Sequence, residues 1–229
     1  DPYLRRPFFL MGAIQGDHLQ ILKHYGRMVA VVLTTALGAS TVEAGVTLAQ
    51  LHHTAWSSRD GAPTGVNALA QSLDGRLWIG TLGGLFTFDG LHFTAFQPAE
   101  GQAAFPSLSV RSLLADPDGS IWVGFLFGGI ARIYGGQVRV WGAAEGVPTG
   151  AVHRIVVSTN KQAWAVAGNR LIRLEGDRWR FVDGAEMGVH RQKAVHDVLV
   201  KRSGELVLAS DDSIFLLPPG KNHFEKTRE

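Results

Sequence analysis

Four polar side chains recur at a nearly constant interval along the chain and could together form a ligand-binding surface. They are separated by 44, 42 and 43 residues, and a mostly apolar run follows each of them. They are Asn67, Arg111, His153 and His196. An amide, a guanidinium and two imidazoles supply hydrogen-bond donors and positive charge, so the set predicts a polar, partly cationic surface suited to an anionic or saccharide-like small molecule. The structural alternative is that the four are hydrogen-bonded spacers, as buried polar side chains usually are.

Other site chemistry has little support. The absence of cysteine excludes a disulfide framework, a thiolate metal site and a cysteine nucleophile. His52 and His53 are adjacent, but neighbours on a strand point to opposite faces and chelate a metal poorly. Asp116 and Asp118 resemble the start of a calcium loop, yet the proline between them and the missing downstream acid favour a hairpin turn. Asp211-Asp212 is interpreted as a solvated turn, and we expect no catalytic residues, no metal and no cofactor.

The charge distribution gives no support for a nucleic-acid partner. The chain has 22 Lys and Arg against 20 Asp and Glu, which leaves a formal net charge of +2. Its basic residues are scattered, whereas nucleic-acid-binding proteins cluster them on one face or in one run.

The elements that must position the four polar residues are short strands. Val66 to Phe96 contains four apolar, β-rich segments separated by Asp-Gly, Gly-Gly and Asp-Gly pairs. Such pairs are typical of tight hairpins, so the segment predicts a four-stranded antiparallel sheet. A single sheet that is apolar on both faces cannot bury itself, and it must therefore stack against copies.

Three further copies follow, with decreasing fidelity. The landmark of the second strand is Trp78, Trp122, Trp164 and finally Val207, again at spacings of 44, 42 and 43 residues. A period of about 40 to 50 residues with four strands in each repeat is typical of β-propeller blades. A β-sandwich would also show regular turns, but it gives no reason for a tryptophan at the same phase of each unit. We expect these tryptophans to be wedges packed between neighbouring sheets.

The predicted fold is therefore all-β, a β-propeller of about four four-stranded antiparallel blades within residues 51–229. The repeat units are about 65–96, 108–141, 150–182 and 193–224. Leu51 to Trp56 could complete a four-bladed ring if the tail around Phe224 is not a strand. If that tail is a strand, the array is open. We favour a partial or open propeller because the last two copies are degenerate, and we expect low stability or association through exposed blade faces.

The N-terminal segment has the order of a secretory signal peptide. Lys23 opens a short basic segment, the apolar run Met28–Leu37 follows, and a small-x-small cleavage pattern ends at Ala44. The apolar run is shorter than the ~20 residues needed to span a bilayer. We therefore predict a helical signal peptide over residues 23–44, a disordered extension over residues 1–22, and export to the periplasm or beyond the cytoplasmic membrane.

The repeat also resembles a known family. The sequence GAPTGVNALAQSLDGRLWIGTLGGLFTFDGLHFTAF is similar to the two-component regulator propeller repeat, which contains DGxLWIGT, a GL pair, FDG and a closing aromatic residue. The first copy, Trp56 to Phe96, matches almost throughout. The second keeps Asp118-Gly119, Ile121 to Gly124 and Gly129-Ile130, and the last two retain little more than the phase. The resemblance covers roughly Leu51 to Leu217.

The resemblance implies a function. Propellers of this family are the extracytoplasmic sensor regions of histidine kinases and diguanylate cyclases, so it implies a ligand-sensing binding module without catalysis of its own, attached to the membrane in the full-length parent. It also implies further blades, a transmembrane helix and an output domain, and we expect this chain to be a fragment or a truncated gene product. The expected partners are a small-molecule or saccharide ligand and a second copy bound through the propeller. The alternatives are an exported propeller enzyme, such as a lyase or glycosidase, and a protein-interaction scaffold.

Overall fold

The computed structural model describes residues 54–184, 194–211, 213–221 and 223–227. The chain divides into two units, Asp1–Thr54 and Ala55–Glu229, and every element described below belongs to the second. The predicted extension and signal peptide lie outside the described residues. Among those that are described, no helix is both long and apolar enough to cross a lipid bilayer.

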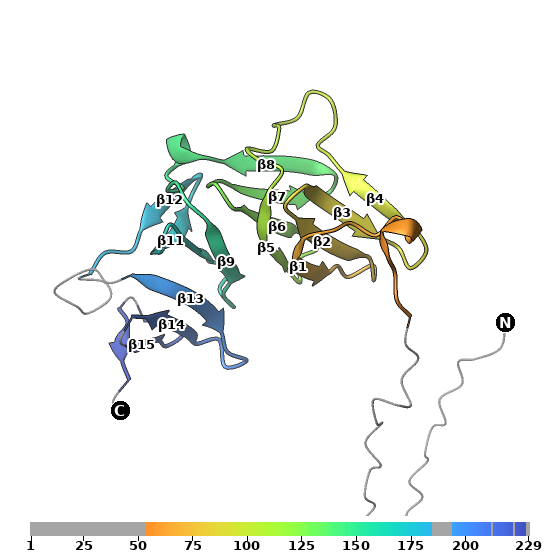
Figure 1. Ribbon diagram of the computed structural model, residues 1–229. Helices are drawn as coiled ribbons and strands as arrows, with labels where there is room; N and C mark the ends of the chain where they lie inside the picture. The colour runs from red at the N-terminus through yellow and green to blue at the C-terminus, as the bar shows by residue number, and fades with distance from the viewer. Residues whose placement is uncertain (1–53, 185–193, 212, 222, 228–229) are drawn as a thin grey trace, which may run out of the picture. The chain divides into compact units, whose positions relative to one another are not determined.

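The described residues form sixteen strands in four sheets (Figure 1). Sheet 1 consists of β1 (Val66–Gln71), β2 (Leu77–Thr81), β3 (Gly84–Phe88) and β4 (Phe93–Phe96). Sheet 2 consists of β5 (Val110–Ala115), β6 (Ile121–Phe125), β7 (Ile130–Tyr134) and β8 (Gln137–Trp141). Sheet 3 consists of β9 (Val152–Val157), β10 (Ala163–Ala167), β11 (Arg170–Glu175) and β12 (Arg178–Phe181). Sheet 4 consists of β13 (Val195–Val200), β14 (Leu206–Ser210), β15 (Ile214–Leu217) and β16 (Glu225–Lys226).

Each sheet is an antiparallel meander in which strands pair in sequence order. The described helical structure is two short 3-10 turns, η2 (Ser58–Asp60) and η3 (Ala143–Glu145), both outside the sheets. The predicted all-β class and the four four-stranded antiparallel blades are thereby confirmed. Connections of a few residues between sequential strands explain the topology, because short hairpins can join only antiparallel neighbours.

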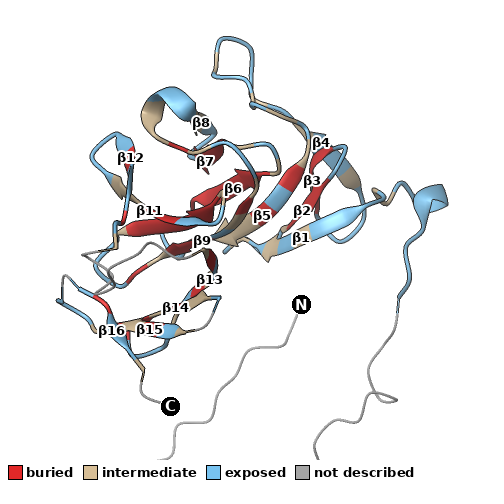
Figure 2. Cartoon of the chain, turned by 60° about the vertical axis from the view of Figure 1, so that its left-hand side comes forward, coloured by how far each residue is buried: buried red, intermediate tan, exposed pale blue. Residues whose placement is uncertain are grey.

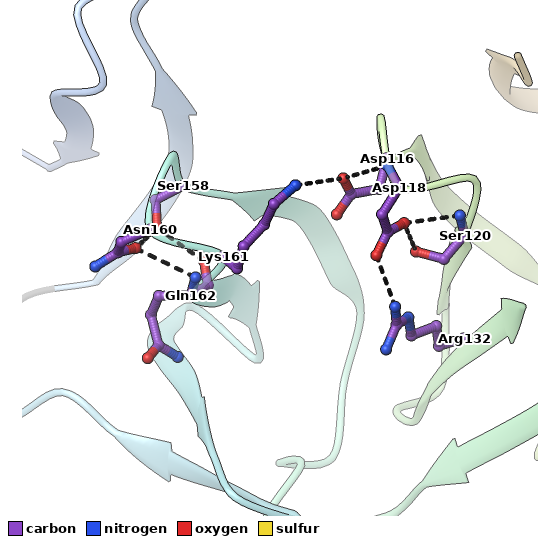
Figure 3. Close-up of polar contacts among 8 residues, drawn as sticks. All are labelled: Asp116, Asp118, Ser120, Arg132, Ser158, Asn160, Lys161 and Gln162. Carbon is purple, nitrogen blue, oxygen red and sulfur yellow. Dashed lines mark hydrogen bonds and ion pairs between the residues drawn. The ribbon is translucent and has the colours of Figure 1, made fainter.

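The first hairpin of every sheet has the same backbone geometry. In each, a backbone N–H donates to the carbonyl three residues earlier, at distances of 2.8 to 2.9 Å. The donor has a positive φ of 84° at Gly75, 89° at Gly119 and 86° at Gly204, and the third sheet instead has Lys161 at 66°. Figure 3 shows the second and third of these hairpins. Glycine adopts this backbone region without steric cost, which is why three of the four turns carry it.

The Asp-containing turn of sheet 2 is a hairpin. The Asp118 carboxylate accepts hydrogen bonds from the backbone N–H and the hydroxyl of Ser120, at 2.8 and 2.6 Å, and pairs with Arg132 at 2.7 Å (Figure 3). Asp116 is buried and lies 4.0 Å from the Lys161 ammonium of the next sheet. The carboxylates are thus engaged by the turn itself and by two cations, which agrees with the interpretation as a turn.

The sheets pack in series through their apolar faces. We call the face that contacts the next sheet the forward face and the face that contacts the preceding sheet the rear face. Each of the three junctions contains one buried cluster, and Figure 2 shows the buried residues concentrated in the strands. Trp78, Trp122 and Trp164 lie on the three forward faces and are 8%, 3% and 6% exposed. The prediction that they are wedges between sheets is confirmed.

The series of sheets is open. The inner strands pack in the order β1, β5, β9 and β13, so sheet 1 and sheet 4 are its ends (Figure 1). Sheet 4 has its own outer strand, β16, which pairs with β15, and Phe224 just before it is buried. Thr54 to Trp56 lies in no strand. The last sheet is therefore completed by the C-terminal tail, and the partial or open propeller predicted from the sequence is what the structure has.

Candidate functional site

The four predicted residues occupy equivalent places in the four inner strands. Each is the second residue of its strand and is the extra residue of a β-bulge, because the pairing register shifts by one across it. The bulge residues are Asn67, Arg111, His153 and His196. A bulge bends the strand and re-aims its side chain. We call this set the bulge site; it lies at the end of the sheets where the second and third strands connect.

Asn67 is engaged in holding two sheets together. Its Nδ2 donates a hydrogen bond of 3.0 Å to the carbonyl oxygen of Val110 in β5. At the next junction the Ser112 hydroxyl donates to the carbonyl oxygen of Val152 in β9, at 2.7 Å. Asn67 therefore has the contact expected of a hydrogen-bonded spacer, which was the structural alternative for this set.

Arg111 and His196 each lie within electrostatic range of His153. His153 is half-buried, whereas Arg111 and His196 are exposed. Burial lowers the pKa of His153, the positive charges of Arg111 and His196 lower it further, and the carboxylate of Asp197 opposes them. The part-buried His153 of β9 thus has a guanidinium on one neighbouring inner strand and an imidazole on the other, and its neutral form is favoured.

A carboxylate from a turn orients His196. Its Nε2 lies 2.6 Å from Oδ1 of Asp211, which follows β14. Both side chains are about half exposed, at 52% and 57%. Asp211 lies in the predicted turn, but it has this specific partner that the sequence interpretation missed, and Asp212 is outside the described residues. The contact fixes one imidazole nitrogen, so the ring presents its other nitrogen elsewhere.

A second ion pair beside the bulge site was also missed. Arg154 and Asp197 follow the bulges of β9 and β13, and their bidentate contact has N···O distances of 2.8 and 3.0 Å. Hydrogen bonds from Arg154 lower the pKa of Asp197. Opposite charges 43 residues apart, at equivalent positions of neighbouring repeats, are the signal that could have found this pair. It ties sheet 3 to sheet 4 next to His153.

A cleft lies at the opposite end of the sheets. It lies between sheets 3 and 4, has a volume of about 570 Å³ and is lined by the first hairpin of sheet 3 and by Pro218 to Lys221. Its volume is within the usual range for ligand pockets. Many of its polar groups already bond one another: Arg173 pairs with Glu175 at 2.6 Å, and Asn160 accepts from the Ser158 hydroxyl. At the bulge site, by contrast, the carboxylates Asp211 and Asp197 pair with His196 and Arg154 and leave the Arg111 guanidinium without an ion pair among the described residues.

The comparisons with known proteins agree with the sequence resemblance. Residues 104–126 match the two component regulator propeller family. This segment runs from the loop before β5 to the residue after β6, in the second copy of the repeat. The resemblance to this family is thereby confirmed, and the match lies in the second copy of the repeat.

Solved structures share the propeller fold at low identity. The extracellular domain of a protein described as a hybrid two component system from B. thetaiotaomicron is 14% identical with a TM-score of 0.62, over 76% of this chain and 26% of that one. A second such domain from B. thetaiotaomicron is 16% identical with a TM-score of 0.59, over 79% and 24%. Virginiamycin B lyase from Staphylococcus aureus is 18% identical with a TM-score of 0.56, over 72% and 56%. No curated protein matches the chain.

These similarities establish the fold. The chain spans about a quarter of the length of the two B. thetaiotaomicron domains. Extracellular domains of two component systems and a lyase share this fold, so the architecture alone does not select between binding and catalysis. That choice rests on the side chains.

Proposed function

We propose that this chain is part of an extracytoplasmic, ligand-sensing propeller of a bacterial signal-transduction receptor, and that it binds an anionic or saccharide-like small molecule at the bulge site without catalysis of its own. The observation that carries the proposal is that Arg111, His153 and His196 occupy equivalent bulge positions in three inner strands that pack side by side. The family match and the two extracellular domains of similar fold support the location and the receptor context.

The three side chains would divide the work of binding an anion. The Arg111 guanidinium is always charged and can donate two parallel hydrogen bonds to a carboxylate. Burial and the positive charges beside it lower the pKa of His153, which favours its neutral form, but a bound anion stabilises the protonated form. Binding is therefore linked to proton uptake, and the affinity should rise as the pH falls through the range in which His153 titrates. His196, held by Asp211, completes the surface.

A ligand that bridges these residues would couple three sheets. Arg111 belongs to sheet 2, His153 to sheet 3 and His196 to sheet 4. A ligand can shift a conformational equilibrium only by its difference in affinity between the two states. Contacts to three sheets at once would favour the arrangement in which their inner strands lie closest, which is how binding could be transmitted along the series.

Calorimetric titration of the exported chain tests the binding surface. The probe is a disaccharide that contains one glucuronic acid, with the matching neutral disaccharide beside it. The Arg111→Ala/His153→Ala variant should bind the acidic probe at least tenfold more weakly than the wild type. The matched control is Arg76→Ala/His92→Ala, which removes the same residue types from turns at the other end of sheet 1. If the wild type and the bulge-site variant bind the acidic probe with equal affinity, the proposal is wrong.

The cleft between sheets 3 and 4 provides the competing location. Asn160 and Lys221 both line it. Loss of binding in an Asn160→Ala/Lys221→Ala variant, with the bulge-site variant unaffected, would place the ligand there instead. Equal binding of the acidic and neutral probes would contradict the role of positive charge.

Catalysis is the alternative, because a lyase shares the fold and His153 has the neutral imidazole that a general base needs. Chromatography of the probe after prolonged incubation with the chain measures turnover. We expect the probe to be recovered intact. Product that forms with the wild type and disappears with His153→Gln would replace the binding role with a catalytic one.

A further inference from the structure

An aromatic residue ends the outer strand of sheets 1 and 2, but not that of sheet 3. Phe96 is the last residue of β4, and Trp141 is the last residue of β8, where it pairs with Ile130. The corresponding residue of sheet 3 is Val182, whose backbone N–H donates a hydrogen bond of 3.0 Å to the carbonyl oxygen of Leu171. Each of the three side chains packs in the cluster ahead of its own sheet. The junction between sheets 3 and 4 therefore has a small side chain where the other two junctions have a ring.

Trp141 shows what a ring at this position contacts. Its indole stacks on that of Trp122, with centroids 5.7 Å apart and an interplanar angle of 15°. Its Nε1 donates a hydrogen bond of 3.2 Å to the carbonyl oxygen of Asp177, in the turn between β11 and β12 of the next sheet. The ring thus fills the space between a wedge tryptophan and the outer hairpin of the following sheet, and Trp141 is only 3% exposed.

The cleft between sheets 3 and 4 is bounded by the two equivalent features. Trp164, the wedge of sheet 3, lines it on one side, and Pro218 to Lys221, in the turn between β15 and β16, line it on the other. Phe224 meets Trp164 edge to face at 6.2 Å, and Trp179 makes the same contact with Trp122 at 6.2 Å. The cleft of about 570 Å³ therefore corresponds in position to the Trp141 ring of the preceding junction.

The turn on the far side of the cleft is longer than its counterpart in sheet 3. β11 ends at Glu175 and β12 begins at Arg178, whereas β15 ends at Leu217 and β16 begins at Glu225. The longer turn begins with two prolines, and the proline ring fixes the backbone angle φ. This wall of the cleft is therefore restrained before a ligand arrives, as is usual for small-molecule sites.

The lining suits an uncharged or anionic aromatic molecule better than a cation. Apolar surface comes from Trp164, Leu206 and Leu217 together with the two prolines. The one acid in the lining is Glu175, and arginines hold both oxygens of its carboxylate: Arg173 at 2.6 Å and Arg180 at 3.1 Å. The Arg173 guanidinium also lies 5.9 Å from the centroid of the Trp164 ring. Because guanidinium groups pack favourably on aromatic faces, a second ring beside Trp164 would be favoured here.

We propose that this cleft is a second binding site and that it takes a small planar aromatic molecule of the indole type, which packs against Trp164 in the place that Trp141 takes beside Trp122. A ring N–H of the ligand donates to the backbone of the turn at 218–221, as Trp141 does to the turn at Asp177. The site is at the opposite end of the sheets from the bulge site, so it does not depend on the proposed function. Both of its walls belong to consecutive repeats of this chain, and blades added before sheet 1 or after sheet 4 would leave them in place.

Titration of the full chain with indole, followed by saturation-transfer NMR, tests the site. We expect indole to bind the wild type, and cyclohexanol, which is of similar size but not planar, to bind at least tenfold more weakly. Val182→Trp supplies from within the chain the ring that Trp141 supplies at the preceding junction, and it should weaken indole binding at least tenfold. Thr159→Phe, in the exposed turn that lines the cleft, should do the same without a change in the core.

The matched control is Thr94→Phe, which makes the same substitution at an exposed position of β4 and should leave indole binding unchanged. A wild type that does not bind indole at millimolar concentration would overturn the proposal. A folded Thr159→Phe variant that binds indole as tightly as the wild type does would also overturn it.

The reciprocal substitution tests whether the two junctions are equivalent. Trp141→Val should open between sheets 2 and 3 the space that Val182 leaves at the next junction, because large-to-small substitutions in a core leave cavities that can bind small apolar molecules. Indole should therefore bind Trp141→Val at two sites and Trp141→Val/Thr159→Phe at one. Circular dichroism of each variant confirms that the sheets are folded. A folded Trp141→Val variant with a single site would contradict the proposal, since the cleft would then not be the counterpart of the Trp141 ring.

Discussion

The close approach of sheets 2 and 3 allows the energetic cost of one substitution to be estimated in detail. Gly124 lies in β6, and a Cβ built there would be 2.7 Å from Cγ1 and 2.9 Å from Cβ of Val152 in the next sheet. Its φ is not in the left-handed region, so Gly124→Ala strains packing and not the backbone. Ordinary contact would require β9 to move away and the Ser112 hydroxyl, which lies still nearer to that Cβ, to be displaced. Both changes disturb the hydrogen bond from Ser112 to the Val152 carbonyl.

The expected loss of stability follows from the overpacking and from the weakened hydrogen bond. Overpacking of this kind costs about 1–3 kcal/mol, a weakened buried hydrogen bond adds about 1 kcal/mol, and replacing glycine in a strand returns about 0.5–1 kcal/mol of conformational entropy. We therefore expect Gly124→Ala to lower the free energy of unfolding by about 2 kcal/mol, measured by urea titration. The control is Gly83→Ala, whose Cβ would meet only the Thr81 hydroxyl at 3.8 Å. If Gly124→Ala proves as stable as Gly83→Ala, the argument from close approach is wrong.

Four further predictions concern the hairpins, the bulge site and the wedges. Lys161→Gly should be about 1 kcal/mol more stable than Lys161→Ala in urea titration, because both lose the ion pair but only glycine relieves the positive φ. His153 should titrate below its ordinary pKa of 6.5 by NMR, and Arg111→Ala should raise that pKa because a positive charge is removed; an unchanged titration would show that the two are not close. Because folding disfavours protonated His153, its contribution to stability is constant above about pH 6.5 and declines as the pH falls below that value; a His153→Gln variant should lose this part of the pH dependence. Trp122→Ala should cost about 3–5 kcal/mol, and a change below 1 kcal/mol would contradict its role as a wedge.

The parts of the fold that could be predicted are those that each repeat encodes locally. Asp-Gly and related pairs specify hairpins through the backbone freedom of glycine, and alternating apolar residues specify the two faces of each sheet. Trp78, Trp122 and Trp164 revealed the repeat because a wedge between sheets needs a large side chain at the same depth each time. Even β16, after two prolines, begins one residue beyond the predicted Phe224.

Only the positions of the candidate site residues in the repeat could be predicted from the sequence. The spacing found the equivalent places of Arg111 and His153 but could not show that each is an extra residue in a bulge, since pairing with the second strand decides that. The ion pair between Arg154 and Asp197 depends on how neighbouring sheets stack. The sequence of a single repeat does not contain that information. Likewise, the sequence could not show that Asn67 is a hydrogen-bonded spacer, because its partner, the Val110 carbonyl, belongs to the next sheet.

The strictly sequential pairing of strands also bears on how the chain folds. Every sheet is a meander, and the inner strands pack in chain order, so these contacts join segments no more than about one repeat apart. Proteins with such low contact order fold quickly, because little loop entropy is lost before contacts form. Arrays of this type gain stability from nearest-neighbour terms and can fold progressively from any repeat. A chain that emerges from the ribosome or crosses a membrane N-terminus first could therefore complete each sheet against the one before it, without waiting for its C-terminus.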